Sequence, residues 1–309
     1  MTIIEVRGLR KVFGDTTAVS GIDLDVSEGE ILGLLGPNGA GKTTAVECIA
    51  GMQRPTAGTV RVAGIDPAAD RDAATRLIGV QLQQAGLQAK LTVREALGLY
   101  ASFYEHPADG ITLAERLGLG PKLGTRYGHL SGGQQQRLAI ALALVGRPRV
   151  ALLDELTTGL DPRSRRDVWE LVEEVRAAGT TVLLVTHLME EAQRLCDRLA
   201  LVDSGRIRAL DTPDGLVARS AAPTVMAFTP DGEVDPARLL AVAGVTDVRR
   251  RGDRLEVTTD DAAVLAVLGL LDRLDVRPHR LRVTESTLDD AYLALVDGTR
   301  TDELTGEPA

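Results

Sequence analysis

The residues with the clearest chemical potential form a glycine-rich segment near the N-terminus. Residues 36–43 fit the phosphate-binding pattern G-x-x-x-x-G-K-[ST] in full. Glycines let the backbone curl so that successive N–H groups point at phosphate oxygens, and the N-terminus of the following helix adds partial positive charge. We expect Lys42 to reach the β- and γ-phosphates of a nucleotide and the Thr43 hydroxyl to ligate Mg²⁺. The predicted nucleotide-binding residues of this segment are Gly36, Pro37, Asn38, Gly39, Ala40, Gly41, Lys42, Thr43 and Thr44.

A pair of carboxylates follows a second apolar run. Residues 150–153 read Val-Ala-Leu-Leu, and Asp154 and Glu155 come directly after them. The carboxyl ends of strands in an α/β sheet are where ligands bind, and adjacent strand residues point in opposite directions. We therefore expect Asp154 to hold Mg²⁺ through water and Glu155 to polarise the attacking water as general base. Without the phosphate-binding loop, a solvated strand end would explain this pair equally well.

A serine-glycine segment lies upstream of that strand, at residues 130–134. By itself, Leu-Ser-Gly-Gly-Gln could simply start a helix with Ser131 as its N-cap. Before a helix and ahead of the Asp154-Glu155 pair, however, it resembles the signature motif of ATP-binding-cassette proteins. The resemblance covers about residues 1–215, and the motifs appear in the family's order and at its spacing. It implies that Ser131, Gly132, Gly133 and Gln134 contact nucleotide.

The same resemblance assigns four further residues. It implies that Phe13 stacks on adenine and that Asp161, in Gly-Leu-Asp at 159–161, belongs to the family's D-loop. Gln83 matches the Q-loop glutamine, a catalytic and metal-contacting residue, and His187 matches the switch histidine. A lone Gln83 or His187 would more often be structural, but their order after a phosphate-binding loop favours the functional interpretation.

The sequence departs from the family pattern at two places. Leu156 stands where the family usually has proline, and Gln81 and Gln84 flank Gln83, so the Q-loop assignment could shift by a position. Neither change removes a catalytic group. Because Glu155 is retained, we expect a competent ATP hydrolase.

The resemblance also implies how the chain assembles. The signature residues would be too far from their own ATP, so they would close on ATP held by a second copy, giving an ATP-dependent homodimer. A helix of a separate membrane permease would dock in a groove lined by residues 85–92. Such permeases have about six transmembrane helices per subunit.

The elements that must position these residues indicate an α/β fold. We predict strands at 3–6, 22–26, 31–35, 60–63, 78–82, 150–153, 181–185, 199–202 and 207–210, with helices at 42–50, 163–178 and 188–197. Strands alternating with helices favour a mostly parallel core sheet. The family resemblance implies a RecA-like core with an antiparallel β subdomain and an inserted helical subdomain at about 90–145.

A second, smaller domain is predicted after the first. We expect the ATP-binding domain to span 1–218, followed by a linker at 219–223 and an α+β accessory domain at 224–298. Its expected order, β-α-β-β-α-β, suggests a ferredoxin-like unit. The polar tail at 299–309 is expected to be disordered.

Composition excludes several classes of function. Aromatic residues make up only 3% of the 309 residues, which argues against base-stacking nucleic-acid modules. A net charge of −9 disfavours phosphate backbones and anionic lipid surfaces, so no nucleic-acid partner is expected. Cys48 and Cys196 lack metal-ligand spacing and fit buried thiols in a reducing cytosol. With no signal peptide or membrane-spanning run, we expect a cytoplasmic protein that reaches the inner face of the membrane through its permease.

The number and spacing of the motifs distinguish this chain from other classes of cassette protein. Tandem cassette proteins carry two phosphate-binding loops per chain, and chromosome-maintenance ATPases separate the two catalytic motifs by long coiled coils; this chain does neither. Residues 130–161, with Leu156 and the small C-terminal domain, look like ATP-binding subunits of drug and antibiotic exporters of the daunorubicin-resistance type. An importer subunit and a non-transport regulatory or repair ATPase remain as alternatives.

Overall fold

The computed structural model describes residues 1–82, 86–219, 223–284 and 286–294. Contacts divide the chain into two compact units, Met1–Pro213 and Asp214–Ala309, and each is described by itself. This division falls a few residues before the predicted boundary at Ala218. A helix, α8 (Pro213–Arg219), spans both positions. Residues 220–222 of the predicted linker and the whole predicted tail, 299–309, lie outside the described residues.

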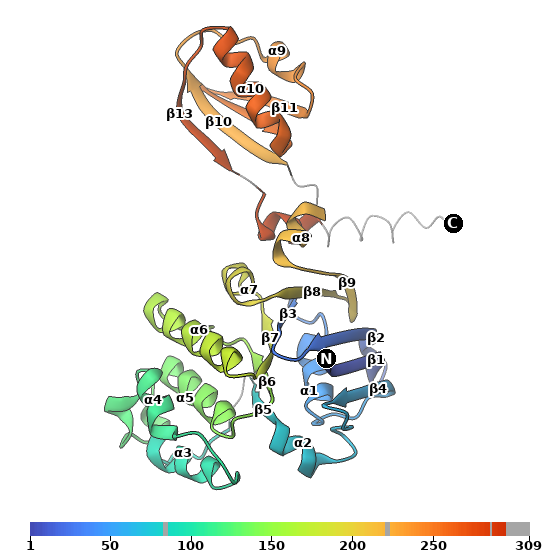
Figure 1. Ribbon diagram of the computed structural model, residues 1–309, viewed down its shortest axis with the longest axis vertical. Helices are drawn as coiled ribbons and strands as arrows, with labels where there is room; N and C mark the ends of the chain where they lie inside the picture. The colour runs from blue at the N-terminus through green and yellow to red at the C-terminus, as the bar shows by residue number, and fades with distance from the viewer. Residues whose placement is uncertain (83–85, 220–222, 285, 295–309) are drawn as a thin grey trace. The chain divides into compact units, whose positions relative to one another are not determined.

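A six-stranded sheet forms the centre of the first unit (Figure 1). Its order is β5-β6-β7-β3-β8-β9, parallel from β5 to β8 and closed by the antiparallel pair β8–β9. Its strands are β3 (Ile31–Leu35), β5 (Ile78–Gln81), β6 (Val150–Asp154), β7 (Thr181–Thr186), β8 (Arg198–Asp203) and β9 (Arg206–Asp211). Every residue of β3, β6 and β7 is buried, which is the pattern of parallel strands covered on both faces. The α/β prediction is confirmed.

A smaller antiparallel sheet has the order β2-β1-β4. It consists of β1 (Thr2–Phe13), β2 (Thr16–Ser27) and β4 (Ala57–Val62), and its first two strands are longer than predicted. Buried residues alternate with exposed ones over much of β1 and β2, so one face is covered. The apolar side chains of this face share one core with the parallel sheet and α1 (Lys42–Ile49).

Three helices pack against one another beyond β5: α3 (Val93–Ala101), α4 (Gly110–Arg116) and α5 (Gly132–Leu144). They lie within 90–145, the range predicted for the helical subdomain. Short 3₁₀ turns at Gly120–Lys122 and Tyr127–His129 lead into α5. The last seven residues of α5 are all buried, so this helix is fixed by packing along its C-terminal half.

The remaining helices of the first unit precede or follow strands of the central sheet. They are α2 (Arg71–Leu77), α6 (Pro162–Ala177) and α7 (Met189–Leu195). α2 links β4 of the smaller sheet to β5, whereas α6 and α7 each link two strands of the central sheet. α6 follows β6 after a short turn, and α7 follows β7 in the same way. Because β6 and β7 are neighbours, both turns lie at the carboxyl edge of the sheet.

The second unit contains the predicted strand and helix order. Its sheet, β11-β12-β10-β13, pairs each strand antiparallel to its neighbours. The elements are β10 (Thr224–Pro230), α9 (Pro236–Leu240), β11 (Val245–Arg251), β12 (Arg254–Thr259), α10 (Asp261–Arg273) and β13 (Pro278–Thr284). Residues 288–294 are also helical. Its own core, centred on Met226, Phe228 and Leu255, makes it a separate folding unit.

Within the parts of the chain that the structure describes, no helix is both long enough and apolar enough to cross a bilayer.

Candidate active site

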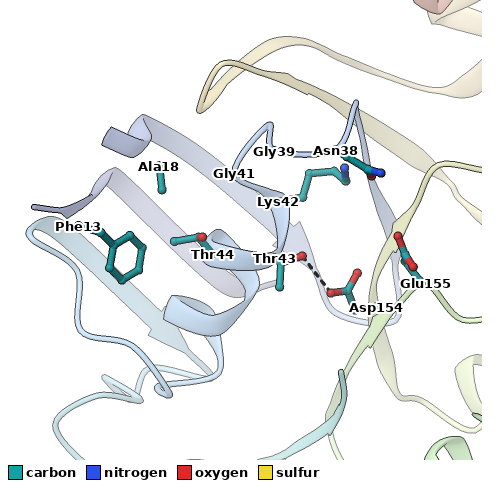
Figure 2. A pocket seen from close by; sticks show the side chains of 10 residues that line it. All are labelled: Phe13, Ala18, Asn38, Gly39, Gly41, Lys42, Thr43, Thr44, Asp154 and Glu155. Carbon is teal, nitrogen blue, oxygen red and sulfur yellow. Dashed lines mark hydrogen bonds between the residues drawn. The ribbon is translucent and has the colours of Figure 1, made fainter. Parts of the chain in front are cut away.

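A cavity of about 460 Å³ opens at the carboxyl edge of the central sheet (Figure 2). It is lined by the β1–β2 hairpin, by the loop between β3 and α1 with the first turn of α1, and by the end of β6 with the residue that follows it. The structure therefore brings together most of the residues predicted from the two strongest motifs. The lining residues are Phe13, Ala18, Asn38, Gly39, Gly41, Lys42, Thr43, Thr44, Asp154 and Glu155.

Close backbone packing explains why the loop needs two of its glycines. Gly41 caps α1 in a left-handed conformation, with φ of 95°, and a Cβ there would overlap the carbonyl oxygen of Ala18. A Cβ on Gly36 would overlap the carbonyl oxygen of Val202 on β8. These glycines let the loop between β3 and α1 fit between β2 and β8.

The Lys42 ammonium lies inside this loop. Its Nζ donates hydrogen bonds to the carbonyl oxygens of Gly36, at 2.7 Å, and Pro37, at 2.9 Å. Burial lowers the pKa of Lys42, and the nearby carboxylates of Asp154 and Glu155 oppose that shift. An ammonium group has three donors, so one remains for a phosphate oxygen.

The hydroxyl of Thr43 donates a hydrogen bond of 3.1 Å to Oδ2 of Asp154. Burial raises the pKa of Asp154, while this hydrogen bond and the charge of Lys42 act in the opposite direction. A hydroxyl and a carboxylate side by side are oxygen donors of the kind that Mg²⁺ prefers. Among the described residues, no three His, Cys, Asp or Glu side chains cluster as a metal site. A magnesium ion here would therefore take its other ligands from phosphate and water, as this ion usually does with nucleotides.

Glu155 follows the strand rather than belonging to it. β6 ends at Asp154, and Glu155 adopts a left-handed conformation with φ of 51°. We expected the two carboxylates to point in different directions because adjacent strand residues alternate. That reason is wrong, because Glu155 lies in a turn after the strand and its left-handed backbone redirects it. Its N–H donates to the Val185 carbonyl at 2.9 Å, which holds the turn against β7. Left-handed backbone is costly for a residue with a side chain, and such strain often marks functional positions.

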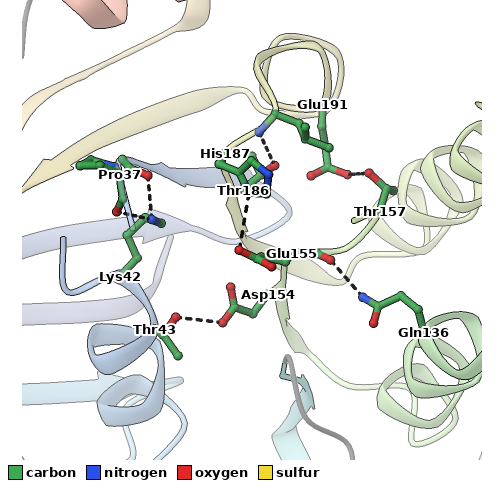
Figure 3. A network of polar contacts seen from close by, with 12 residues as sticks. Pro37, Lys42, Thr43, Gln136, Asp154, Glu155, Thr157, Thr186, His187 and Glu191 are labelled. Atoms are coloured by element: carbon green, nitrogen blue, oxygen red, sulfur yellow. Dashed lines mark hydrogen bonds and ion pairs between the residues drawn. The ribbon is translucent and has the colours of Figure 1, made fainter. Parts of the chain in front are cut away.

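His187 lies beside Glu155 (Figure 3). Its Nδ1 is 3.5 Å from Oε1 of Glu155, and it directly follows the last residue of β7. The predicted base and the predicted switch histidine are thus neighbours, because β6 and β7 are adjacent in the sheet.

The signature segment does not line this cavity. Ser131 is the N-cap of α5 and forms a capping box: its Oγ accepts from the Gln134 N–H, and Oε1 of Gln134 accepts from the Ser131 N–H. Ser131 and Gly132 are exposed. The helix-cap interpretation is confirmed, and contact of Ser131, Gly132, Gly133 and Gln134 with a nucleotide remains a prediction.

Asp161 is also a helix cap in this structure. Its carboxylate accepts hydrogen bonds from the N–H groups of Arg163 and Ser164 and from the Ser164 hydroxyl, at the start of α6. These bonds, the one from the Ser164 hydroxyl above all, lower the pKa of Asp161. It does not line the cavity, so its nucleotide contact stays a prediction.

The structure describes Phe13 but not Gln83. Phe13 lies at the edge of the cavity with 46% of its surface exposed, and Lys11 Nζ is 4.8 Å from its ring centre. Gln83 lies outside the described residues, as does Gln84. Gln81 is buried, and its Nε2 donates to the Asp154 carbonyl oxygen at 3.0 Å, which ties β5 to the end of β6.

Sequence reasoning missed the side chains that hold the Glu155 turn. Gln136 Nε2 donates to the carbonyl oxygens of Glu155, at 3.0 Å, and Leu156, at 3.2 Å. The Thr157 hydroxyl donates to Glu191. These contacts join residues far apart in the chain, and no local sequence pattern signals them.

Comparisons with known proteins agree with this geometry. The family model described as ABC transporter matches residues 19–158. The daunorubicin/doxorubicin resistance ATP-binding protein DrrA of Streptomyces peucetius is 38% identical, over 99% of this chain and 96% of that protein. The Nod factor export ATP-binding protein I of Rhizobium etli is 40% identical over 70% of each chain.

A solved structure supports the same family. An ATP-binding cassette, seen as a dimer in a post-hydrolysis state bound to ADP and Pi, matches with a TM-score of 0.62 and 27% identity. The match covers 68% of this chain and 98% of that one. The extended similarity to DrrA, together with the cavity that gathers Lys42, Thr43, Asp154 and Glu155, shows that this chain belongs to the ABC transporter family as an ATP-binding, ATP-hydrolysing subunit.

Proposed function

We propose that this chain hydrolyses Mg²⁺-ATP to drive export through a separate membrane permease. The observation that carries the catalytic part is the cavity that the Lys42 loop, the Thr43–Asp154 pair and Glu155 line together. His187 stands behind Glu155, with its Nδ1 3.5 Å from Oε1 of that carboxylate. Phosphoryl transfer depends on positioning and charge neutralisation more than on covalent chemistry, and these groups supply both.

Each residue has a distinct part in this proposal. Lys42 and the loop N–H groups hold the β- and γ-phosphates, and Phe13 contacts the adenine. Thr43 and Asp154 hold Mg²⁺, which neutralises charge on the phosphates when it is bound. Glu155 orients the attacking water and accepts its proton, while His187 keeps the Glu155 carboxylate directed at the reacting phosphate. Gln83 completes the proposed set as a catalytic and metal-contacting residue.

The signature residues serve a second copy of the chain. Ser131 and Gly133 would close on ATP held by another subunit, so that two chains enclose two nucleotides in a two-fold dimer. In support, Ser131 and Gly132 are exposed and lie outside their own cavity, and the similar cassette bound to ADP and Pi is a dimer. Hydrolysis would then release the dimer, because the γ-phosphate that joins its halves is lost.

The export direction rests on the relatives. Two of them are named for drug resistance and Nod factor export, and both match as ATP-binding proteins. We infer that this chain couples to a permease of about six helices per subunit and reaches the inner face of the membrane through it. The cargo would be a drug, an antibiotic or a lipid-like molecule.

The Glu155→Gln variant tests the catalytic assignment. We expect ATP affinity to stay within about threefold and steady-state hydrolysis to fall by on the order of a hundredfold or more, since a carboxamide cannot accept the proton. The ATP-dependent dimer of this variant should become stable, which light scattering measures. The matched control is Glu173→Gln, a half-exposed carboxylate on α6 that is paired with Arg194.

Near-normal hydrolysis by Glu155→Gln would remove Glu155 as the base. The transport assignment is tested separately, with the wild-type chain reconstituted beside its permease in vesicles. Drug efflux that requires ATP supports export, whereas ATP-driven uptake would make this an importer subunit.

A further inference from the structure

We propose that Glu191 is a positioning residue for hydrolysis: through Thr157 it fixes the turn that carries Glu155 relative to His187. The inference rests on the proposed role of Glu155 as general base. It adds a residue on α7 that touches neither nucleotide nor cavity.

Glu191 is a fully buried carboxylate, with 0% of its surface exposed. Its Oε1 accepts a hydrogen bond from the Thr157 hydroxyl at 2.8 Å and another from Trp169 Nε1 at 3.1 Å. Figure 3 shows the first of these contacts next to the Glu155–His187 pair. One oxygen atom therefore joins α7, α6 and the turn after β6.

This arrangement costs stability. The second oxygen, Oε2, is buried and has no hydrogen-bond partner among the described residues. Burying a carboxyl group with half of its acceptors unused is unfavourable, and an apolar side chain would fill the same space without that cost. A buried polar group retained at such a position calls for a reason other than packing.

The Glu155 turn supplies that reason, because its strained backbone needs support from outside. The Glu155 N–H is held by the Val185 carbonyl, and Gln136 on α5 donates to the Glu155 and Leu156 carbonyls. Thr157 adds a side-chain contact that reaches α7. The turn is thus fixed on one side by the helix that begins at the signature segment and on the other by Glu191.

His187 lies two residues before the same helix. α7 begins at Met189, and the Leu188 N–H donates to the Thr186 hydroxyl at 3.0 Å, which fixes the entry to α7. Glu191 is the third residue of α7 and follows His187 by four positions in the chain. The Thr157–Glu191 hydrogen bond therefore sets how the Glu155 turn lies against the His187 segment, and so supports the 3.5 Å approach of Oε1 to Nδ1. Errors of about 1 Å in such positioning can cost a hundredfold in rate.

Two substitutions at Glu191 distinguish the contribution of its hydrogen bond to kcat from the contribution of its charge. Glu191→Leu removes the acceptor, and we expect kcat to fall at least about tenfold while the KM for ATP changes by less than about twofold. Glu191→Gln keeps an acceptor oxygen without the charge, and we expect kcat within about threefold of wild type. The matched control is Glu190→Leu, because Glu190 is the preceding residue but is exposed and paired with Arg165.

A double-mutant cycle tests the route through Thr157. Thr157→Val keeps the side-chain shape and should lower kcat about as much as Glu191→Leu, and the double variant should lose little more than the larger single loss. Trp169→Phe removes the other donor and should leave kcat within about twofold of wild type, since that bond does not reach the Glu155 turn.

The outcomes distinguish this inference from the proposed function. If Glu155→Gln is inactive but Glu191→Leu and Thr157→Val both hydrolyse ATP like wild type, the positioning role is wrong and the catalytic assignment stands. Full activity of Glu155→Gln would overturn both. If Glu191→Leu unfolds, Thr157→Val decides. Equal losses of ATP binding and of kcat in Thr157→Val, or no rescue in Glu191→Gln, would show a purely structural contact.

Discussion

The Thr43 hydroxyl and Oδ2 of Asp154 are joined by a 3.1 Å hydrogen bond between the first turn of α1 and the end of β6. The two residues are 111 positions apart in the chain, and their contact aligns the phosphate-binding loop with the proposed metal ligand. Burial keeps the Asp154 carboxyl in an unfavourable environment for charge, which a bound cation would relieve.

The Asp154→Asn variant should distinguish the effect of the carboxylate on the stability of the free protein from its effect on Mg²⁺ binding. Burial raises the folded-state pKa of Asp154 above its ordinary value of 3.8, so the protonated carboxyl favours the folded state. This contribution to the free energy of unfolding is fully present below pH 3.8 and is lost as pH rises through the folded-state pKa. Asparagine does not titrate. At pH 7 the variant should therefore match or exceed the wild-type Tm without nucleotide, and its advantage should shrink toward pH 4.

Thermal unfolding at several pH values, with and without Mg²⁺-ATP, checks this prediction. The same variant should lose most of the Tm increase that Mg²⁺-ATP produces, because it lacks the anionic ligand. A variant that is less stable than wild type at pH 7 yet equal to it at pH 4 would show that the ionised carboxylate stabilises the free protein, contrary to our reasoning.

Lys42→Ala should weaken ATP binding by about tenfold to a hundredfold, because a charge-assisted contact to phosphate is lost. The two carbonyl groups that accept from its Nζ, those of Gly36 and Pro37, would also lose their donor, so the loop would be less well ordered. Titration calorimetry with ATP measures the effect. Lys90→Ala, at an exposed lysine outside the cavity, is the control, and unchanged affinity in Lys42→Ala would contradict the phosphate-binding assignment.

Ser131 has two roles that different substitutions can separate. Ser131→Ala removes the N-cap of α5 and should cost about 1 kcal/mol of stability in denaturant unfolding. Ser131→Asp keeps a good cap, so its stability should stay near wild type. If Ser131 meets the γ-phosphate of a second subunit, the carboxylate repels it and ATP-dependent dimerisation should disappear.

Light scattering of the Ser131→Asp variant, combined with Glu155→Gln to prevent turnover, measures that dimerisation. Glu155→Gln alone is the reference. Undiminished dimerisation of the combined variant would mean that Ser131 acts only as a helix cap.

The amino-acid sequence by itself determined the parts of the site that are contiguous in the chain. The loop from Gly36 to Thr44 is recognisable from its glycine spacing and from the strand and helix around it, although the close approach of Ala18 and Val202 that makes two of its glycines necessary is tertiary. The buried strand before Asp154 and the Ser131–Gln134 cap were also predictable from local patterns. The order of strands and helices in the second unit likewise followed from local periodicity.

The tertiary structure decided everything that depends on which strands become neighbours. Local patterns do not encode the order β6-β7-β3, yet that order brings Asp154 to Thr43 and Glu155 to His187. The left-handed turn at Glu155 and the buried Glu191 that supports it were likewise invisible, because strain and burial arise only when distant segments pack. Short-range sequence patterns specify the chemical groups, but long-range packing sets the distances between them.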